Sequence, residues 1–229
     1  MITITAQYAY IYLVGALTVV WIILYTLNPR THKQQLFMSL IFSPLATIAE
    51  ILYFKDYWNP LSILSGNIRP VRILLEDFIF AFCIVGIASV IAKPFLRDSR
   101  KYLNQNNTNF LILILLTVLL SWGLFILGIN SIYAASLSFL SSASLMIFWR
   151  KNLLRDSFLS GLGTCLVMFF IYALGFYITK NSEDILRQIW YLYGTTLGTR
   201  VLGVPLTELI WAFTLGMFIG PLYTFFKTE

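Results

Sequence analysis

The sequence predicts an all-α membrane protein with seven transmembrane helices in a single domain of 229 residues. Its residues are 59% hydrophobic and only 11% charged, and the mean hydropathy is +0.79. A soluble domain is closer to half apolar and about a quarter charged, because its surface has to be covered with polar groups. In lipid this requirement disappears, and each apolar segment must satisfy its own backbone groups as a helix.

Three of the predicted spans occupy the first part of the chain, and each is close to the roughly 20 residues that cross a bilayer. They cover residues 7–27, 36–54 and 71–92. Asn28-Pro29-Arg30 ends the first, Asn59-Pro60 follows the second, and Lys93-Pro94 closes the third. The N-terminus lacks the basic start and the cleavage site of a signal peptide, so the first run is expected to remain as a span.

Four further spans are predicted at residues 109–128, 130–149, 157–179 and 204–226. A polar run from Lys101 to Asn109 precedes the first of these. Asn130 is expected to make a tight turn before the next span, which Arg150-Lys151-Asn152 closes.

Lysine and arginine are unevenly distributed over the predicted loops. Ten of the 16 fall in the loops after spans one, three and five and in the C-terminal tail. Cytoplasmic loops carry an excess of these residues. The sequence therefore predicts an integral protein of the cell membrane with its N-terminus outside and its C-terminus in the cytoplasm. The net charge of +6 belongs to these loops, and no nucleic-acid partner is expected.

No cofactor and no metal site are predicted. Cys83 and Cys165 both lie in apolar runs, and His32, the one histidine, lies in a short loop. These residues indicate neither a disulfide framework nor a set of metal ligands. The sequence contains no glycine-rich phosphate loop and no dinucleotide-binding motif.

An internal repeat of about three helices is predicted, with one copy near residues 36–95 and the other near residues 170–227. An aromatic segment precedes the last span of each copy. These segments are Tyr57-Trp58-Asn59-Pro60 and Trp190-Tyr191-Leu192-Tyr193.

The two copies align over residues 74–82 and 205–213. Asp77 then matches Glu208, and Leu, Ala and Phe are identical at three other positions. Both segments open a span that enters from the same side of the membrane.

Four acidic residues lie within or at the lip of predicted spans, namely Glu50, Glu76, Asp77 and Glu208. Each is about one turn from the end of its helix, so alternating helix directions bring them to a similar depth on one side. Acids inside a membrane are costly and mark functional sites. We therefore expect a shared catalytic site, with Glu208 and Asp77 as the leading candidates because they match in the repeat.

Aromatic side chains are expected to wall this site. The candidate substrate-binding residues are Tyr53, Trp58, Trp190, Trp211 and Pro205. A carboxyl group in an apolar site tends to stay protonated at neutral pH, and a second carboxylate with aromatic faces can stabilise a carbocation. This combination suits proton-initiated chemistry on an alkene dissolved in the bilayer.

Structural roles would account for the same residues. The helix dipole favours acids in the first turn of a helix, and Arg72 lies four residues before Glu76, so the two can pair. Arg200 can pair with Glu208 or Glu50, and the Trp and Tyr residues can form an interfacial belt. The sequence leaves these alternatives open.

The residues around Glu208 resemble a family signature. The segment Leu202-Gly203-Val204-Pro205-Leu206-Thr207-Glu208 resembles the Pro-x-Glu-(Glu/Asp) motif of lycopene cyclase domains. The first copy resembles it in Trp58-Asn59-Pro60 and Leu74-Leu75-Glu76-Asp77-Phe78. Leu74 stands where the family often has Pro, Thr207 where it often has Glu, and Glu50 where an Asp is expected. A chain of this length with two copies resembles the fused form of these small membrane cyclases.

The resemblance implies cofactor-free cyclisation of the linear ends of lycopene, a lipid-soluble polyene. A carboxylic acid would protonate the terminal double bond, the cation would close the ring, and a base would remove a proton. Glu208 corresponds to the second acid of the signature, Asp77 to its counterpart, and Glu76 to the first acid of the earlier motif.

Other classes stay open beside this interpretation, including a cyclase of another isoprenoid. A seven-helix sensor is one, although the only lysine of the last span, Lys227, lies at its end, which argues against a retinal Schiff base. A transporter is another: the repeat favours it, but the acids lie near one face and not at the midplane. The sequence also leaves open whether the chain forms a homo-oligomer.

Overall fold

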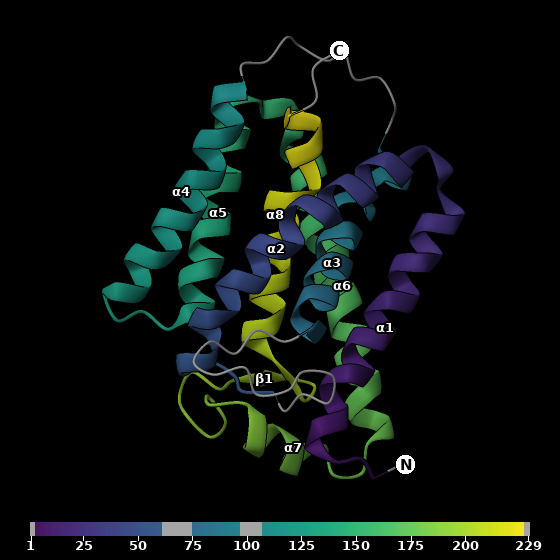
Figure 1. The fold of residues 1–229 in the computed structure, drawn as a ribbon, viewed down its shortest axis with the longest axis vertical. Helices are drawn as coiled ribbons and strands as arrows, with labels where there is room; N and C mark the ends of the chain where they lie inside the picture. The colour runs from purple at the N-terminus through teal and green to yellow at the C-terminus, as the bar shows by residue number, and fades with distance from the viewer. Residues whose placement is uncertain (1–2, 61–74, 97–106, 227–229) are drawn as a thin grey trace.

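Long α-helices that alternate in direction make up the computed structural model, which describes residues 3–60, 75–96 and 107–226. In Figure 1, α1, α3, α5 and α8 run one way along the bundle, and α2, α4 and α6 run the other way. The bounds of these helices are Ala6–Leu27 for α1, His32–Asp56 for α2, Leu75–Val90 for α3, Asn107–Ile126 for α4, Ser131–Trp149 for α5, Leu154–Ile178 for α6 and Leu206–Phe226 for α8.

The positions of the predicted spans agree with these helices to within a few residues. Among the described residues, six helices are long and apolar enough to cross a membrane. The remaining one, α4, contributes a shorter apolar stretch, Phe110–Ile126. The all-α class is thus confirmed, whereas the count of seven spans and the direction of the termini stay predictions.

The two ends of the bundle are built differently. At one end, short 3₁₀ turns follow α1, α3 and α5, and each contains one basic residue: Arg30, Lys93 or Lys151. At the other end lies a short amphipathic helix, α7 (Ser182–Ile189), and a hairpin of β1 (Arg200–Val201) and β2 (Val204–Pro205). The sequence did not predict these last elements, because each is far shorter than a span.

The turn of this hairpin positions the start of α8. Leu202 and Gly203 both have positive φ, 50° and 86°, as the tight two-residue turn of a hairpin requires. The predicted tight turn at Asn130 is confirmed, since its side chain accepts a hydrogen bond from the backbone N–H of Ile132 and caps α5. Asp56, at the end of α2, accepts from the backbone N–H of Ser131 at 2.9 Å and joins the two helices.

Helices α6 and α8 pack closely through small residues. A Cβ atom built on Gly216 would lie 2.6 Å from the carbonyl oxygen of Ser160 and 2.9 Å from the Cα of Gly161. Gly220, one turn further along α8, also faces Ser160. Small residues four apart are the usual device for close packing of helices in lipid, where no hydrophobic effect drives association.

The helices pack as two pairs that meet in the middle of the bundle. α2 packs on α3, α6 packs on α8, and α3 contacts α8. Phe80 of α3 and Trp211 of α8 stack with ring centroids 6.0 Å apart. These two residues occupy matched positions in the predicted repeat. The repeat itself stays a prediction.

A surface cluster joins α7 to the hairpin. Arg200 Nη1 donates to Glu183 Oε1 at 2.6 Å, and the Tyr193 hydroxyl donates to Glu183 Oε2 at 2.8 Å. The guanidinium groups of Arg187 and Arg200 lie 5.3 and 5.5 Å from the centroid of the Tyr193 ring. The hydrogen bonds from Arg200 and then from Tyr193 lower the pKa of Glu183 below its ordinary value of 4.5.

We predict that Gly216→Val destabilises the protein by about 1–3 kcal/mol, because the added methyl groups force α6 and α8 apart. The measurement is thermal unfolding in detergent. Gly15→Val is the matched control, since a Cβ there meets no atom within 4 Å. Equal unfolding temperatures for the two variants would show that close contact of α6 and α8 is not needed.

We predict that Glu183 stabilises the attachment of α7 at neutral pH and not in acid. A carboxyl group whose folded pKa is lowered stabilises the fold above its unfolded pKa, and this contribution disappears as the pH falls through the folded value. Glu183→Gln should therefore lower the unfolding temperature at neutral pH and have no effect well below pH 4.5. Asp184→Asn, a neighbouring exposed acid, is the control. A Glu183→Gln effect that is independent of pH would contradict this role.

Candidate functional site

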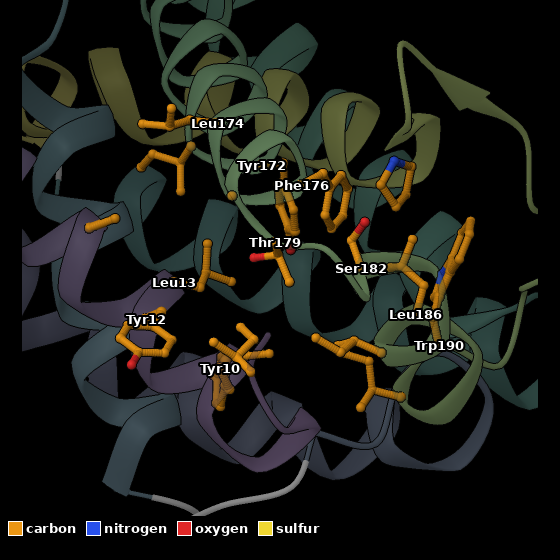
Figure 2. Close-up of a pocket in the computed structure, with 18 of the residues that line it drawn as sticks. Tyr10, Tyr12, Leu13, Tyr172, Leu174, Phe176, Thr179, Ser182, Leu186 and Trp190 are labelled. Atoms are coloured by element: carbon orange, nitrogen blue, oxygen red, sulfur yellow. The ribbon is translucent and has the colours of Figure 1, made fainter. Parts of the chain in front are cut away.

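A cavity of about 350 Å³ lies at the end of the bundle that carries α7. Its volume falls in the range of about 300–1,000 Å³ that is typical of ligand sites. Residues of α1, such as Tyr12 and Leu13, face Phe176 and Leu174 of α6 across it, and α7 closes one side (Figure 2). Trp58, Pro205 and Glu208 complete the wall, which is otherwise almost entirely apolar.

A second, much smaller cavity of about 20 Å³ adjoins the first. Glu208 and Trp58 line both cavities. The other residues around the small cavity are Glu50, Tyr53, Tyr57, Phe80, Ile132 and Trp211. A cavity of at least about 10–15 Å³ with polar partners is large enough to hold one water molecule.

Glu208 is the acid that faces the large apolar cavity. It lies in the first turn of α8 and is buried, with 8% of its surface exposed. The Tyr57 hydroxyl donates to Glu208 Oε1 at 2.5 Å and lies 3.1 Å from Thr207 Oγ1. Tyr57 belongs to the segment after α2, so this hydrogen bond joins one predicted repeat to the acid of the other.

Glu50 lies near the end of α2 and is also buried. The indole Nε1 of Trp58 donates to Glu50 Oε2 at 3.1 Å. Because Glu50 and Glu208 line the same small cavity, the structure brings these two predicted acids together.

Asp77 is connected to the same group through aromatic side chains. The hydroxyl of Tyr10, in α1, donates to Asp77 Oδ1 at 2.7 Å, and both residues are buried. The Tyr10 ring meets the Trp58 ring edge to face, with centroids 4.9 Å apart. Asp77 and Glu50 are therefore held by two neighbouring rings.

Glu76 differs from the other predicted acids. It is buried in the first turn of α3 but lines neither of the two cavities. Its predicted partner, Arg72, lies outside the described residues. The predicted pairing of Arg200 with Glu208 or Glu50 is wrong, because the Arg200 guanidinium binds Glu183 on the surface.

The predicted aromatic residues surround the two cavities. Trp190 and Pro205 line the large one, and Tyr53 and Trp211 line the small one. Trp211 Nε1 donates to the Tyr53 hydroxyl at 3.3 Å. Trp190 is buried, and its Nε1 has no hydrogen-bond partner among the described residues. The interfacial-belt alternative does not explain this arrangement, since side chains of a belt face the lipid headgroups.

Sequence reasoning missed three tyrosines of the site. Tyr10 and Tyr57 donate to Asp77 and Glu208, and Tyr172 of α6 lines the large cavity. Tyr10 and Tyr172 lie in spans that were not assigned to the site. A hydroxyl within an apolar helix indicates a polar neighbour in lipid, but the sequence does not say which residue that neighbour is.

The sequence matches the family described as lycopene cyclase over residues 5–95 and 130–226. The matched residues include α1, α2, α3, α5, α6, α7 and α8, and they leave out the whole of α4. No curated protein matches the chain, and no solved structure does. Because the match covers most of the chain, the protein belongs to the lycopene cyclase family.

Proposed function

We propose that this protein cyclises the linear ends of a carotenoid polyene by proton-initiated, cofactor-free chemistry. Membership of the family gives the chain a lycopene cyclase-like function in carotenoid biosynthesis. One observation supports the finer proposal above all others: Glu208 is a buried carboxyl group at the wall of an apolar, aromatic cavity.

Glu208 acts as the acid in this proposal. One end of the polyene occupies the large cavity, and the protonated carboxyl group delivers its proton to the terminal double bond. The resulting cation is attacked by a second double bond of the same chain, which closes the ring and moves the cation into it. Loss of a proton from the ring restores a double bond. One proton is added and one is removed, so the reaction is an isomerisation that needs no oxidant or reductant.

The aromatic walls support the cationic intermediate. Tyr10, Trp58 and Trp190 line the large cavity, and the faces of such rings attract cations by their quadrupole. Water would capture the cation, so a wall that is almost entirely apolar also protects the intermediate.

Glu50 is the second carboxyl group of the proposed mechanism. It shares the small cavity with Glu208, and one water molecule there would connect the two side chains. A proton that leaves the ring can then return to Glu208 before the next turnover. Asp77, held by Tyr10, adds a further acidic group behind the Trp58 ring.

Glu208→Gln is predicted to lower cyclisation by at least about a hundredfold, the usual contribution of a general acid. The chain and the variant are expressed in a host that accumulates lycopene, and the extracted pigments are separated by chromatography. Asp184→Asn, which changes an exposed acid outside the cavities, is the control and should convert the pigment normally. Undiminished conversion by Glu208→Gln would assign the acid to another carboxyl group.

Tyr57→Phe is predicted to slow the reaction by about tenfold to a hundredfold, because a hydrogen bond to an acidic group is worth about 1.5–3 kcal/mol. Tyr57 is a positioning residue in this proposal, so the variant should also displace the pH profile of the rate. Tyr133→Phe is the matched control, since the Tyr133 hydroxyl donates to the backbone carbonyl of Leu197 and the residue lines neither cavity. Equal rates and pH profiles for both variants would remove Tyr57 from the mechanism.

A further inference from the structure

The large cavity has its rim on the outer surface of the bundle, between α1 and α6. Its rim consists of exposed apolar side chains: Tyr12 of α1 is 57% exposed, and Leu174 and Ile178 of α6 are 61% and 43% exposed. Its floor is formed by Tyr10, Trp190 and Glu208, which are all buried. The cavity therefore leads from the outer surface of the helices to the proposed acid.

This rim lies at a depth that lipid chains reach. Tyr12 is six residues from the start of α1, and Leu174 is four residues from the end of α6. At 1.5 Å per residue, these side chains are about 9 Å and about 6 Å inside the helix ends. The part of the rim at Tyr12 and Leu174 therefore lies at the depth of the lipid chains, whereas Ile178 is at the end of α6.

The opening is bordered by small residues on both helices. Ala9 and Ala16 of α1 and Gly175 of α6 line the cavity. A Cβ atom built on Gly175 would meet no other atom within 4 Å. Gly175 therefore differs from Gly216, which is tightly packed and whose small size allows close contact between α6 and α8.

We propose that the polyene reaches Glu208 laterally from the bilayer, by passing one end between α1 and α6 across Ala16 and Gly175. This inference rests on the proposed function, because it takes a carotenoid to be the molecule that enters the cavity. The Nε1 of Trp190 has no hydrogen-bond partner among the residues that the structure describes, which favours a polyene over a saturated lipid chain, since an indole N–H can donate to a π system. The carboxyl group of Glu208 lines the same cavity, where it can give a proton to a double bond.

The route also determines the order of events for a substrate with two linear ends. A cavity of about 350 Å³ holds one end, while the rest of a long polyene stays in the lipid. Each ring closure then needs its own insertion, and the singly cyclised polyene returns to the bilayer between the two.

The proposed route can be tested with substitutions that block the opening, one on α1 and one on α6. Gly175→Phe and Ala16→Phe place a large side chain in the passage without touching an acid. Gly15→Phe is the matched control, because Gly15 is an exposed neighbour on α1 that has free space and does not line the cavity. Thermal unfolding establishes that each variant is folded.

Two readouts separate the access route from the chemistry. The first is saturable quenching of tryptophan fluorescence by lycopene in reconstituted membranes, and the second is the rate of cyclisation. We expect Gly175→Phe and Ala16→Phe to weaken quenching and slow cyclisation by about tenfold or more, and Gly15→Phe to behave as the unsubstituted protein. If the folded Gly175→Phe and Ala16→Phe variants bind and convert lycopene as the unsubstituted protein does, the lateral route is wrong.

The outcomes distinguish this inference from the proposed function. If the unsubstituted protein binds lycopene but does not cyclise it, and Gly175→Phe and Ala16→Phe abolish binding, the lateral route is supported and the proposed function is wrong. If the unsubstituted protein cyclises lycopene and the two phenylalanine substitutions change neither binding nor cyclisation, the proposed function is supported and the lateral route is wrong. Absence of saturable binding to the unsubstituted protein would contradict the route directly.

Discussion

The backbone pairing between two aromatic segments is the interaction on which the site depends. The N–H of Asn59 donates to the carbonyl of Ile189 at 2.7 Å, and the N–H of Tyr191 donates to the carbonyl of Tyr57 at 3.0 Å. This pairing places Trp58 beside Trp190 in an antiparallel bridge. Non-helical backbone is tolerated at membrane depth only where its polar groups are satisfied within the protein. The pairing meets that condition, and it fixes the segment after α2 against the wall of the large cavity.

The buried acids turn this scaffold into a reactive site. For two of these acids a hydrogen-bond partner comes from a distant segment: Tyr10 of α1 donates to Asp77 of α3, and Tyr57 donates to Glu208 of α8. Each partner presents a ring to a cavity as well as a polar hydrogen to an acid. The residues that make buried carboxyl groups tolerable are thus the ones that shape the space for an apolar substrate. Stability and substrate recognition use the same side chains.

The helices could be predicted from the sequence because lipid enforces a simple rule, namely that a long apolar run must be helical. The acids could be predicted for a related reason, since a carboxyl group in such a run is costly and therefore conspicuous. The hydrogen-bond partners of these acids could not be predicted. Tyr10 lies in an apolar helix, and the sequence does not distinguish it from a tyrosine that faces lipid. The pairing of Arg200 with Glu183 depends on the course of the hairpin. Helix α7 was missed because its eight residues carry no span-length signal.

The buried ion pair at the far end of the bundle has a consequence for how the protein is made. Lys93 Nζ, after α3, lies 3.1 Å from Asp156 Oδ2 in the first turn of α6 and 3.2 Å from Thr224 Oγ1 in α8. A buried charge without its partner is strongly unfavourable, and Lys93 leaves the ribosome long before Asp156. Asp156, whose side chain is 2% exposed, is the more deeply buried partner, so its burial requires α6 to pack beside Lys93. Assembly of the bundle is thus coupled across the two halves of the chain, because Lys93 of the first half joins α6 and α8 of the second.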